Sequence, residues 1–153
     1  MADARFFRMT ARWHLPHPRG LVFAALADAD AYTTWWPQVR EATRVDDRSG
    51  TARLRSVIPM SLRVTVTEQV RDATRGELRA AIEGDLVGWS RWQISDDDEH
   101  PHSAAVVDFT QEVLLHKRIP TVLIVVGRPL LRLNHRHMMR AGHRGLSRWL
   151  RDR

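Results

Sequence analysis

Alternation of apolar and polar residues runs through most of the chain and predicts a sheet. From Phe7 to Leu15 apolar side chains occupy every second position, which is typical of a strand with one buried face. The same period returns at Val39 and continues to Leu115, interrupted by turns rich in Gly, Asp or Pro. We therefore expect seven strands, at 5–15, 39–46, 51–58, 62–70, 77–83, 86–95 and 104–115.

Between the first two predicted strands the spacing becomes helical. Pro18 suits the first turn of a short helix that ends near Ala27, because proline's missing N–H costs nothing there. Asp28 suits the N-cap of a second short helix, Ala29 to Trp35, which Pro37 terminates. The pattern predicts a pair of short helices joined by a tight turn.

After Pro120 the period is helical to the end of the chain. Apolar residues recur at spacings of three and four, which predicts one long helix that Pro129 kinks or breaks. Its inward stripe is expected to consist of Val122, Val126, Leu130, Leu133, Asn134, His137, Met138, Ala141, Gly142, Gly145, Leu146 and Trp149.

These elements together predict an α+β architecture. Strands joined by short turns pair as an antiparallel meander, and the first strand returns to one edge of it. We expect a seven-stranded curved antiparallel sheet wrapped around a long C-terminal helix, with two short helices between strands one and two. A chain of 153 residues with 43% apolar content suits a single domain over residues 1–153.

Several features favour a cytoplasmic protein. The chain has no cysteine, which agrees with a reducing compartment, and its start lacks the basic stretch and apolar run of a secretory signal. The most apolar stretch, Ile119 to Gly127, is nine residues long, whereas a membrane span needs about 20. We expect this stretch to be a buried helix segment.

Positive charge gathers at the C-terminal end. Residues 1–117 carry a net charge of −2, whereas residues 118–153 carry nine basic and one acidic side chain, a net of +8. The basic side chains of this segment form a row of arginines. This arginine row is either the ordinary polar face of an amphipathic helix or a contact surface for an anionic membrane or an acidic protein. Groove reading of DNA is not expected, because the opposite face packs on the sheet. The arginines recur every four residues at Arg128, Arg132, Arg136, Arg140, Arg144 and Arg148.

Three regions carry a family resemblance: 31–39 (AYTTWWPQV), 84–92 (GDLVGWSRW), and in the last helix 133–135 (LNH) with 138–146 (MMRAGHRGL). With the order of elements, they resemble bacterial members of the SRPBCC superfamily, the START-like, polyketide cyclase/dehydrase-like proteins of the helix-grip fold. The resemblance implies this fold and a cavity between sheet and helix. Members bind lipids, sterols, hormones or polyketide-like compounds, and some catalyse cyclisation or dehydration, so the resemblance alone assigns no reaction.

The inward faces of two strands support such a cavity. Gln111 is the lone polar residue on the inward face of the last strand, and it bonds either a ligand or water in the cavity, or a neighbouring backbone group. Gly88 and Ser90 are small and leave volume beside Trp92. Asn134 offers a donor and an acceptor from the long helix, for a ligand or for helix packing.

We accordingly expect binding of a small hydrophobic, lipid- or polyketide-like ligand. The alternatives are a cyclase or dehydratase, and a module that binds anionic surfaces through the arginine row. Trp35 and Trp36 are placed near the entrance of the cavity. The expected ligand-binding residues are Trp35, Trp36, Val64, Val66, Leu78, Ile82, Trp92, Phe109, Gln111, Asn134 and Met138.

Catalysis has no positive signature in the sequence. There is no phosphate-binding glycine loop, no H-E-x-x-H motif and no nominated Ser-His-Asp set, so we expect neither a metal nor a cofactor. His100 and His102 follow an acidic turn that is typical of a solvated loop. His137 is the best acid/base candidate if it faces inward, and otherwise it is a packing histidine.

Overall fold

One antiparallel sheet of seven strands organises the computed structural model, which describes residues 4–55 and 61–153. The strand order is β1-β7-β6-β5-β4-β3-β2, so β2 to β7 form a meander and β1 pairs with β7 at its edge. The predicted topology is confirmed. The strands are β1 Phe6–Leu15, β2 Val39–Arg44, β3 Ser49–Arg55, β4 Ser61–Asp72, β5 Glu77–Gly84, β6 Leu86–Asp96 and β7 Ala105–Leu115.

Strand boundaries differ from the predicted ones by a few residues. β3 begins at Ser49, before the predicted Thr51, because Ser49 pairs with Thr67 across the sheet. Ile58 and the turn at Pro59, both assigned from the sequence, lie outside the described residues. Pairing with a neighbouring strand, which the periodicity does not reveal, sets where each strand ends.

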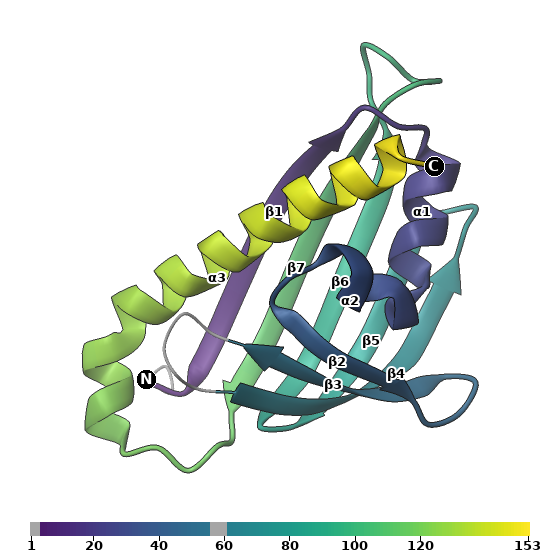
Figure 1. Ribbon diagram of the computed structural model, residues 1–153. Coiled ribbons are helices and arrows are strands. Elements are labelled where there is room, and N and C mark those ends of the chain that lie inside the picture. Colours follow the sequence, from purple (N-terminus) through teal and green to yellow (C-terminus); the bar gives the residue numbers. More distant parts are fainter. Residues whose placement is uncertain (1–3, 56–60) are drawn as a thin grey trace.

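The segment between β1 and β2 forms α1 (Arg19–Ala27), a 3₁₀ turn η1 (Ala29–Ala31) and α2 (Tyr32–Trp35). The predicted helix pair is present, but Asp28 makes no side-chain capping hydrogen bond within the described residues. These helices cover one end of the concave face of the sheet (Figure 1).

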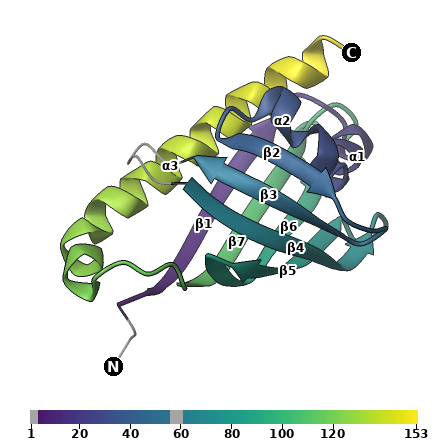
Figure 2. The same ribbon diagram turned by 60° about the horizontal axis from the view of Figure 1, so that its bottom comes forward.

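The long helix α3 (Thr121–Arg151) crosses the concave face of the sheet obliquely (Figures 1 and 2). Pro129 lies inside it without breaking it, and Figure 1 shows the first turns set at an angle to the rest. Within the described part of the chain, no helix combines the length and apolarity needed to cross a bilayer.

In the first half of α3, the residues that face the sheet differ from the predicted ones. Val122, Val126, Leu130, Leu133 and His137 are exposed, and Ile124, Leu131, His135 and Met139 face the sheet instead. The prediction was wrong because this half carries apolar residues all around the helix, so spacings of three and four fit more than one face. The expected buried segment at 119–127 is likewise exposed on its outer side.

Two arginines hold the start of α3 against β1 and β7. The guanidinium of Arg5 donates to the carbonyl oxygens of Lys117, at 3.1 Å, and of Ile119. The guanidinium of Arg128 donates to the carbonyl oxygen of Phe6, at 3.1 Å, and lies 4.5 Å from the ring centre of Phe7. Arg128 is therefore turned back onto the protein, unlike the later members of the predicted arginine row, which are exposed.

Small residues let the second half of α3 approach α2 closely. A Cβ atom at Gly145 would stand 1.8 Å from the carbonyl oxygen of Trp35, and one at Gly142 would stand 2.7 Å from the indole of Trp36. The indole Nε1 of Trp36 donates to the carbonyl oxygen of Met138, at 3.0 Å. This contact fixes the distance between α3 and the end of α2.

Candidate ligand-binding cavity

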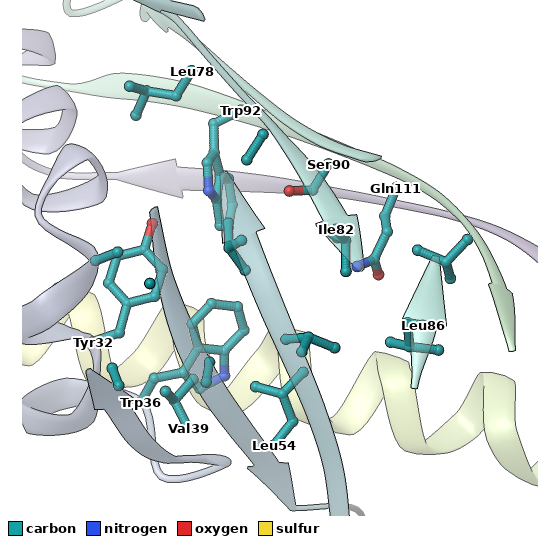
Figure 3. A pocket seen from close by; sticks show the side chains of 18 of the residues that line it. Tyr32, Trp36, Val39, Leu54, Leu78, Ile82, Leu86, Ser90, Trp92 and Gln111 are labelled. Atoms are coloured by element: carbon teal, nitrogen blue, oxygen red, sulfur yellow. The ribbon is translucent and has the colours of Figure 1, made fainter. Parts of the chain in front are cut away.

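A cavity of about 330 Å³ lies between the concave face of the sheet and α3 (Figure 3). The buried core is divided into two clusters, and the cavity is lined by members of both. One cluster contains Trp36, Trp92 and Phe109, and the other contains Phe7 and Val113. The core is interrupted where these clusters face each other.

Cross-strand neighbours explain where the open volume lies. Leu78, Trp92 and Phe109 are paired across β5, β6 and β7 and form a bulky row on the concave face. The next row along the strands consists of Ala80, Ser90 and Gln111, of which the first two are small. Volume is left beside the bulky row because the neighbouring side chains are too short to fill it.

Two polar side chains point into this volume. The amide of Gln111 and the hydroxyl of Ser90 both face the cavity (Figure 3). Among the residues that the structure describes, neither side chain has a hydrogen-bond partner. The sequence left two partners possible for Gln111: a ligand or water in the cavity, or a neighbouring backbone group. Among the described residues, Gln111 makes no side-chain hydrogen bond to a backbone group. The amide is thus open to a partner inside the cavity.

Two other polar groups of the wall, on Tyr32 and Trp36, are already satisfied. The hydroxyl of Tyr32 donates to the carbonyl oxygen of Leu26, and burial raises the pKa of this phenol, so it stays protonated. The indole N–H of Trp36 is used by Met138. These groups fix α2 in place and are not free to orient a ligand.

His135 is the titratable group of the α3 wall. Its ring lies nearly parallel to that of Phe109, with the ring centres 6.1 Å apart. Its Nε2 atom is inaccessible to solvent and has no hydrogen-bond partner among the described residues. Burial lowers the pKa of His135 to about 4, so the imidazole is neutral at physiological pH.

The structure brings most of the predicted ligand-binding residues together around the cavity. The exception is Trp35, which is buried against Trp36 with ring centres 5.4 Å apart and does not line the cavity. The residues that do line it are Trp36, Val64, Val66, Leu78, Ile82, Trp92, Phe109, Gln111, Asn134 and Met138.

The rim of the cavity lies away from the two tryptophans that were expected near the entrance. Trp35 and Trp36 are both buried, so that expectation was wrong. Exposed lining residues instead come from η1 and the turn between β2 and β3, where Arg44 and Asp30 form an ion pair at 2.9 Å. Exposed lining residues also occur at Arg55 and Arg71, on β3 and β4.

Sequence reasoning placed His137 on the wrong side of α3. His137 is exposed, and His135 lines the cavity in its place. Tyr32, Met9 and Leu131 also line the cavity and were not among the predicted wall residues. Met9 could have been found, because it shares the inward period of β1 and pairs with Gln111. Within the described residues no cluster of His, Asp and Glu has the geometry of a metal site.

The neutral His135 predicts a distinctive dependence of stability on pH. An unfolded histidine titrates near 6.5, so between pH 6.5 and 4 the unfolded state binds a proton that the folded state does not. Stability should therefore fall as the pH is lowered through this window, by at most about 3 kcal/mol, since partial exposure screens the charge. Chemical denaturation across this range measures the slope.

Two variants isolate this effect. His135→Phe should flatten the fall in stability between pH 6.5 and 4 relative to the wild type. The exposed His137→Gln, two residues away, should leave it unchanged. Identical pH profiles for wild type and His135→Phe would show that His135 is not held neutral.

Comparisons with known proteins agree with this architecture. The family model described as polyketide cyclase / dehydrase and lipid transport matches residues 15–138. The comparison with curated proteins finds no match.

Three solved structures share the fold. The chain is similar to the Zhui aromatase/cyclase of Streptomyces sp. R1128, with a TM-score of 0.76 and 12% identity over 93% of this chain and 92% of the other. A protein of Thermus thermophilus gives a TM-score of 0.70 and 17% identity over 90% and 95%. A START superfamily protein of Mycobacterium smegmatis gives 0.54 and 16% over 88% and 96%. At these identities the likeness establishes the helix-grip fold.

Proposed function

Because the chain belongs to the polyketide cyclase/dehydrase and lipid transport family, we propose that its cavity binds a small hydrophobic molecule bearing a polar group, of the lipid or polyketide kind. The cavity volume of about 330 Å³ falls within the usual range for small-molecule sites. Its wall is mostly apolar, with Gln111 and Ser90 side by side on β7 and β6 and charged side chains at the rim. That combination binds a ligand by burial and orients it by hydrogen bonds.

The observation that carries this proposal is the unpartnered amide of Gln111. Gln111 is half-buried and the concave face of β7 is otherwise apolar, so a ligand that covered this amide without pairing with it would lose roughly 1 to 3 kcal/mol. A carbonyl or hydroxyl group on a ligand would satisfy the amide, and the hydroxyl of Ser90 stands on the paired position of β6. A carbonyl-bearing hydrophobic molecule therefore fits better than a plain hydrocarbon.

Replacing Gln111 by Leu should weaken binding of the neutral naphthalene ketone Prodan about tenfold. The substitution keeps the volume of the side chain and removes the donor for the probe's carbonyl, a loss of about 1.4 kcal/mol. The blue shift of Prodan fluorescence on titration gives the dissociation constant. Prodan has no charge, so the arginines of α3 do not contribute to its binding.

The matched control is Gln69→Leu, an exposed glutamine on the convex side of β4. This variant should bind Prodan as the wild type does. Equal affinity of the wild type and the Gln111 variant would contradict the role of the amide, and absence of Prodan binding altogether would contradict the cavity as a ligand site.

A second candidate function is a cyclase or dehydratase, favoured by the neutral imidazole of His135 on the cavity wall. A neutral imidazole can accept a proton from a carbonyl compound held against it. If so, His135→Phe should accumulate a bound molecule that is heavier by one water than the one bound to the wild type. Mass spectrometry of the extracted ligand separates the two candidates.

The pKa of His135 indicates which of the two candidate functions is better supported. An efficient general base has a pKa near the working pH, whereas burial lowers that of His135 to about 4. A histidine held this far from neutrality is a weak base. Ligand binding without chemistry is therefore the better-supported function.

A further inference from the structure

The first half of α3 exposes a continuous apolar surface on the side facing away from the sheet. Six apolar side chains on this side are between 51% and 74% exposed, and we call them the outward face. They are Val122, Leu123, Val125, Val126, Leu130 and Leu133. Apolar patches of this kind on soluble proteins mark sites of interaction.

The packing of α3 on the sheet does not require the apolar residues of the outward face. The opposite side of the same turns is already committed to the protein, since Ile124 is 2% exposed and Leu131 lines the cavity. A helix that only covers the sheet needs one apolar stripe, and a helix that is apolar all around is normally buried on all sides. A second apolar surface therefore needs an occupant of its own.

The charges around the outward face indicate what that occupant is. From Arg118 to Arg151 the chain contains basic residues and no acidic one. Arg132 and Arg136 are exposed next to the outward face, and Arg140 is exposed one turn further on. Along α3 the surface thus combines an apolar patch with neighbouring charges that are all positive.

We propose that the outward face docks on an anionic lipid bilayer. The apolar side chains would enter the boundary between headgroups and acyl chains, and Arg132 and Arg136 would meet the lipid phosphates. This is the arrangement of an interfacial helix, which lies in the plane of the membrane without spanning it. Charge complementarity selects this occupant.

A second copy of the chain fits the surface poorly. A two-fold symmetric contact would bring the same arginines of both copies together, and this segment offers no carboxylate to pair with them. Like charges brought together in an interface oppose association. A bilayer of anionic lipid supplies the missing negative charge.

The fold presents this surface without rearrangement. Arg128 anchors the first turns of α3 to the backbone of β1, and Arg5 binds the backbone of the connection that leads from β7 into α3. The outward face is on the other side of the helix from the wall residues His135 and Leu131. Docking therefore does not depend on the cavity being a ligand site.

Sedimentation with vesicles of phosphatidylcholine, with and without phosphatidylglycerol, tests the proposal on the full chain. The protein should bind the vesicles that contain phosphatidylglycerol, and binding should weaken as salt is raised. Val126→Asp should reduce binding at least tenfold, because Val126 is 74% exposed and the new carboxylate is repelled by the lipid. Arg132→Gln should reduce it by a smaller factor.

The matched control is Val45→Asp, at a valine that is 65% exposed in the turn between β2 and β3. It should bind vesicles as the wild type does, and so should Gln111→Leu. Circular dichroism verifies that each variant is folded. If Val126→Asp does not fold, Leu130→Asp replaces it as the variant that disrupts the outward face.

Three results with vesicles would overturn the proposal: no binding to anionic vesicles, equal binding by Val126→Asp and the wild type, or binding that does not require phosphatidylglycerol. A dimer in sedimentation equilibrium that Val126→Asp dissociates would also overturn it, because it would assign the outward face to a second copy. Loss of binding in Gln111→Leu alone would instead point to lipid uptake into the cavity.

Discussion

Replacing Gly145 by Ala is expected to lower the free energy of unfolding by about 2 to 3 kcal/mol. The added methyl group would stand 1.8 Å from the carbonyl oxygen of Trp35, which is a backbone atom and not the end of a flexible side chain. Either α3 or α2 must shift by more than an ångström, which disturbs the contact between Trp36 and Met138. Urea denaturation followed by tryptophan fluorescence measures the change.

The control is Gly127→Ala in the same helix. A Cβ atom at Gly127 meets nothing within 4 Å, so this variant should gain about 0.5 to 1 kcal/mol from the higher helix propensity of alanine. The two glycine variants should therefore change stability in opposite directions. Equal effects at the two positions would mean that α3 does not approach α2 as described.

Trp92→Ala should cost about 3 to 5 kcal/mol, the largest effect that we expect from a single substitution. Trp92 is buried, with ring centres 4.5 Å from Phe109, 5.2 Å from Trp13 and 6.2 Å from Trp36. Removing the indole deletes the centre of this aromatic cluster and joins the vacated volume to the ligand cavity. Thermal and urea denaturation both report the loss.

Trp89 provides the comparison on the same strand. It is partly exposed on the convex side of β6, where the guanidinium of Arg79 lies 4.3 Å from its ring centre. Trp89→Ala removes this contact and leaves the core intact, so it should cost about 1 kcal/mol. A larger loss for Trp89→Ala than for Trp92→Ala would place the core on the wrong face of the sheet.

The sheet could be predicted from the sequence because each strand carries its own local signal. In β7 the residues facing α3 alternate strictly with the others, and turn residues such as Gly84 and Asp85 mark where the chain reverses. Gln111 was found for the same reason, since one polar residue in an apolar row is visible without a structure. The resemblance to a known family added the curvature and the cavity.

The orientation of α3 could not be predicted, because its first half has two apolar sides. Spacings of three and four fit the series Val122, Val126 and Leu130 as well as the series Ile124 and Leu131. Only contact with Phe7 and its neighbours decides which side faces the sheet. The exchange of His135 for His137 at the cavity follows from this choice.

Trp35 was misplaced for a related reason. Adjacent residues at the end of α2 point in different directions, and the sequence does not say which of Trp35 and Trp36 faces the cavity. The close approach of Gly145 to the backbone of Trp35 settles the packing of α2 on α3. Long-range contacts of this kind have no local signature.

Native mass spectrometry of the freshly purified protein tests the ligand cavity most directly. We expect an additional mass bound to the folded chain, corresponding to a small hydrophobic molecule that is released on denaturation and competes with Prodan. A folded protein that carries only the mass of the bare polypeptide, and that also remains empty after incubation with hydrophobic ketones, would contradict this expectation.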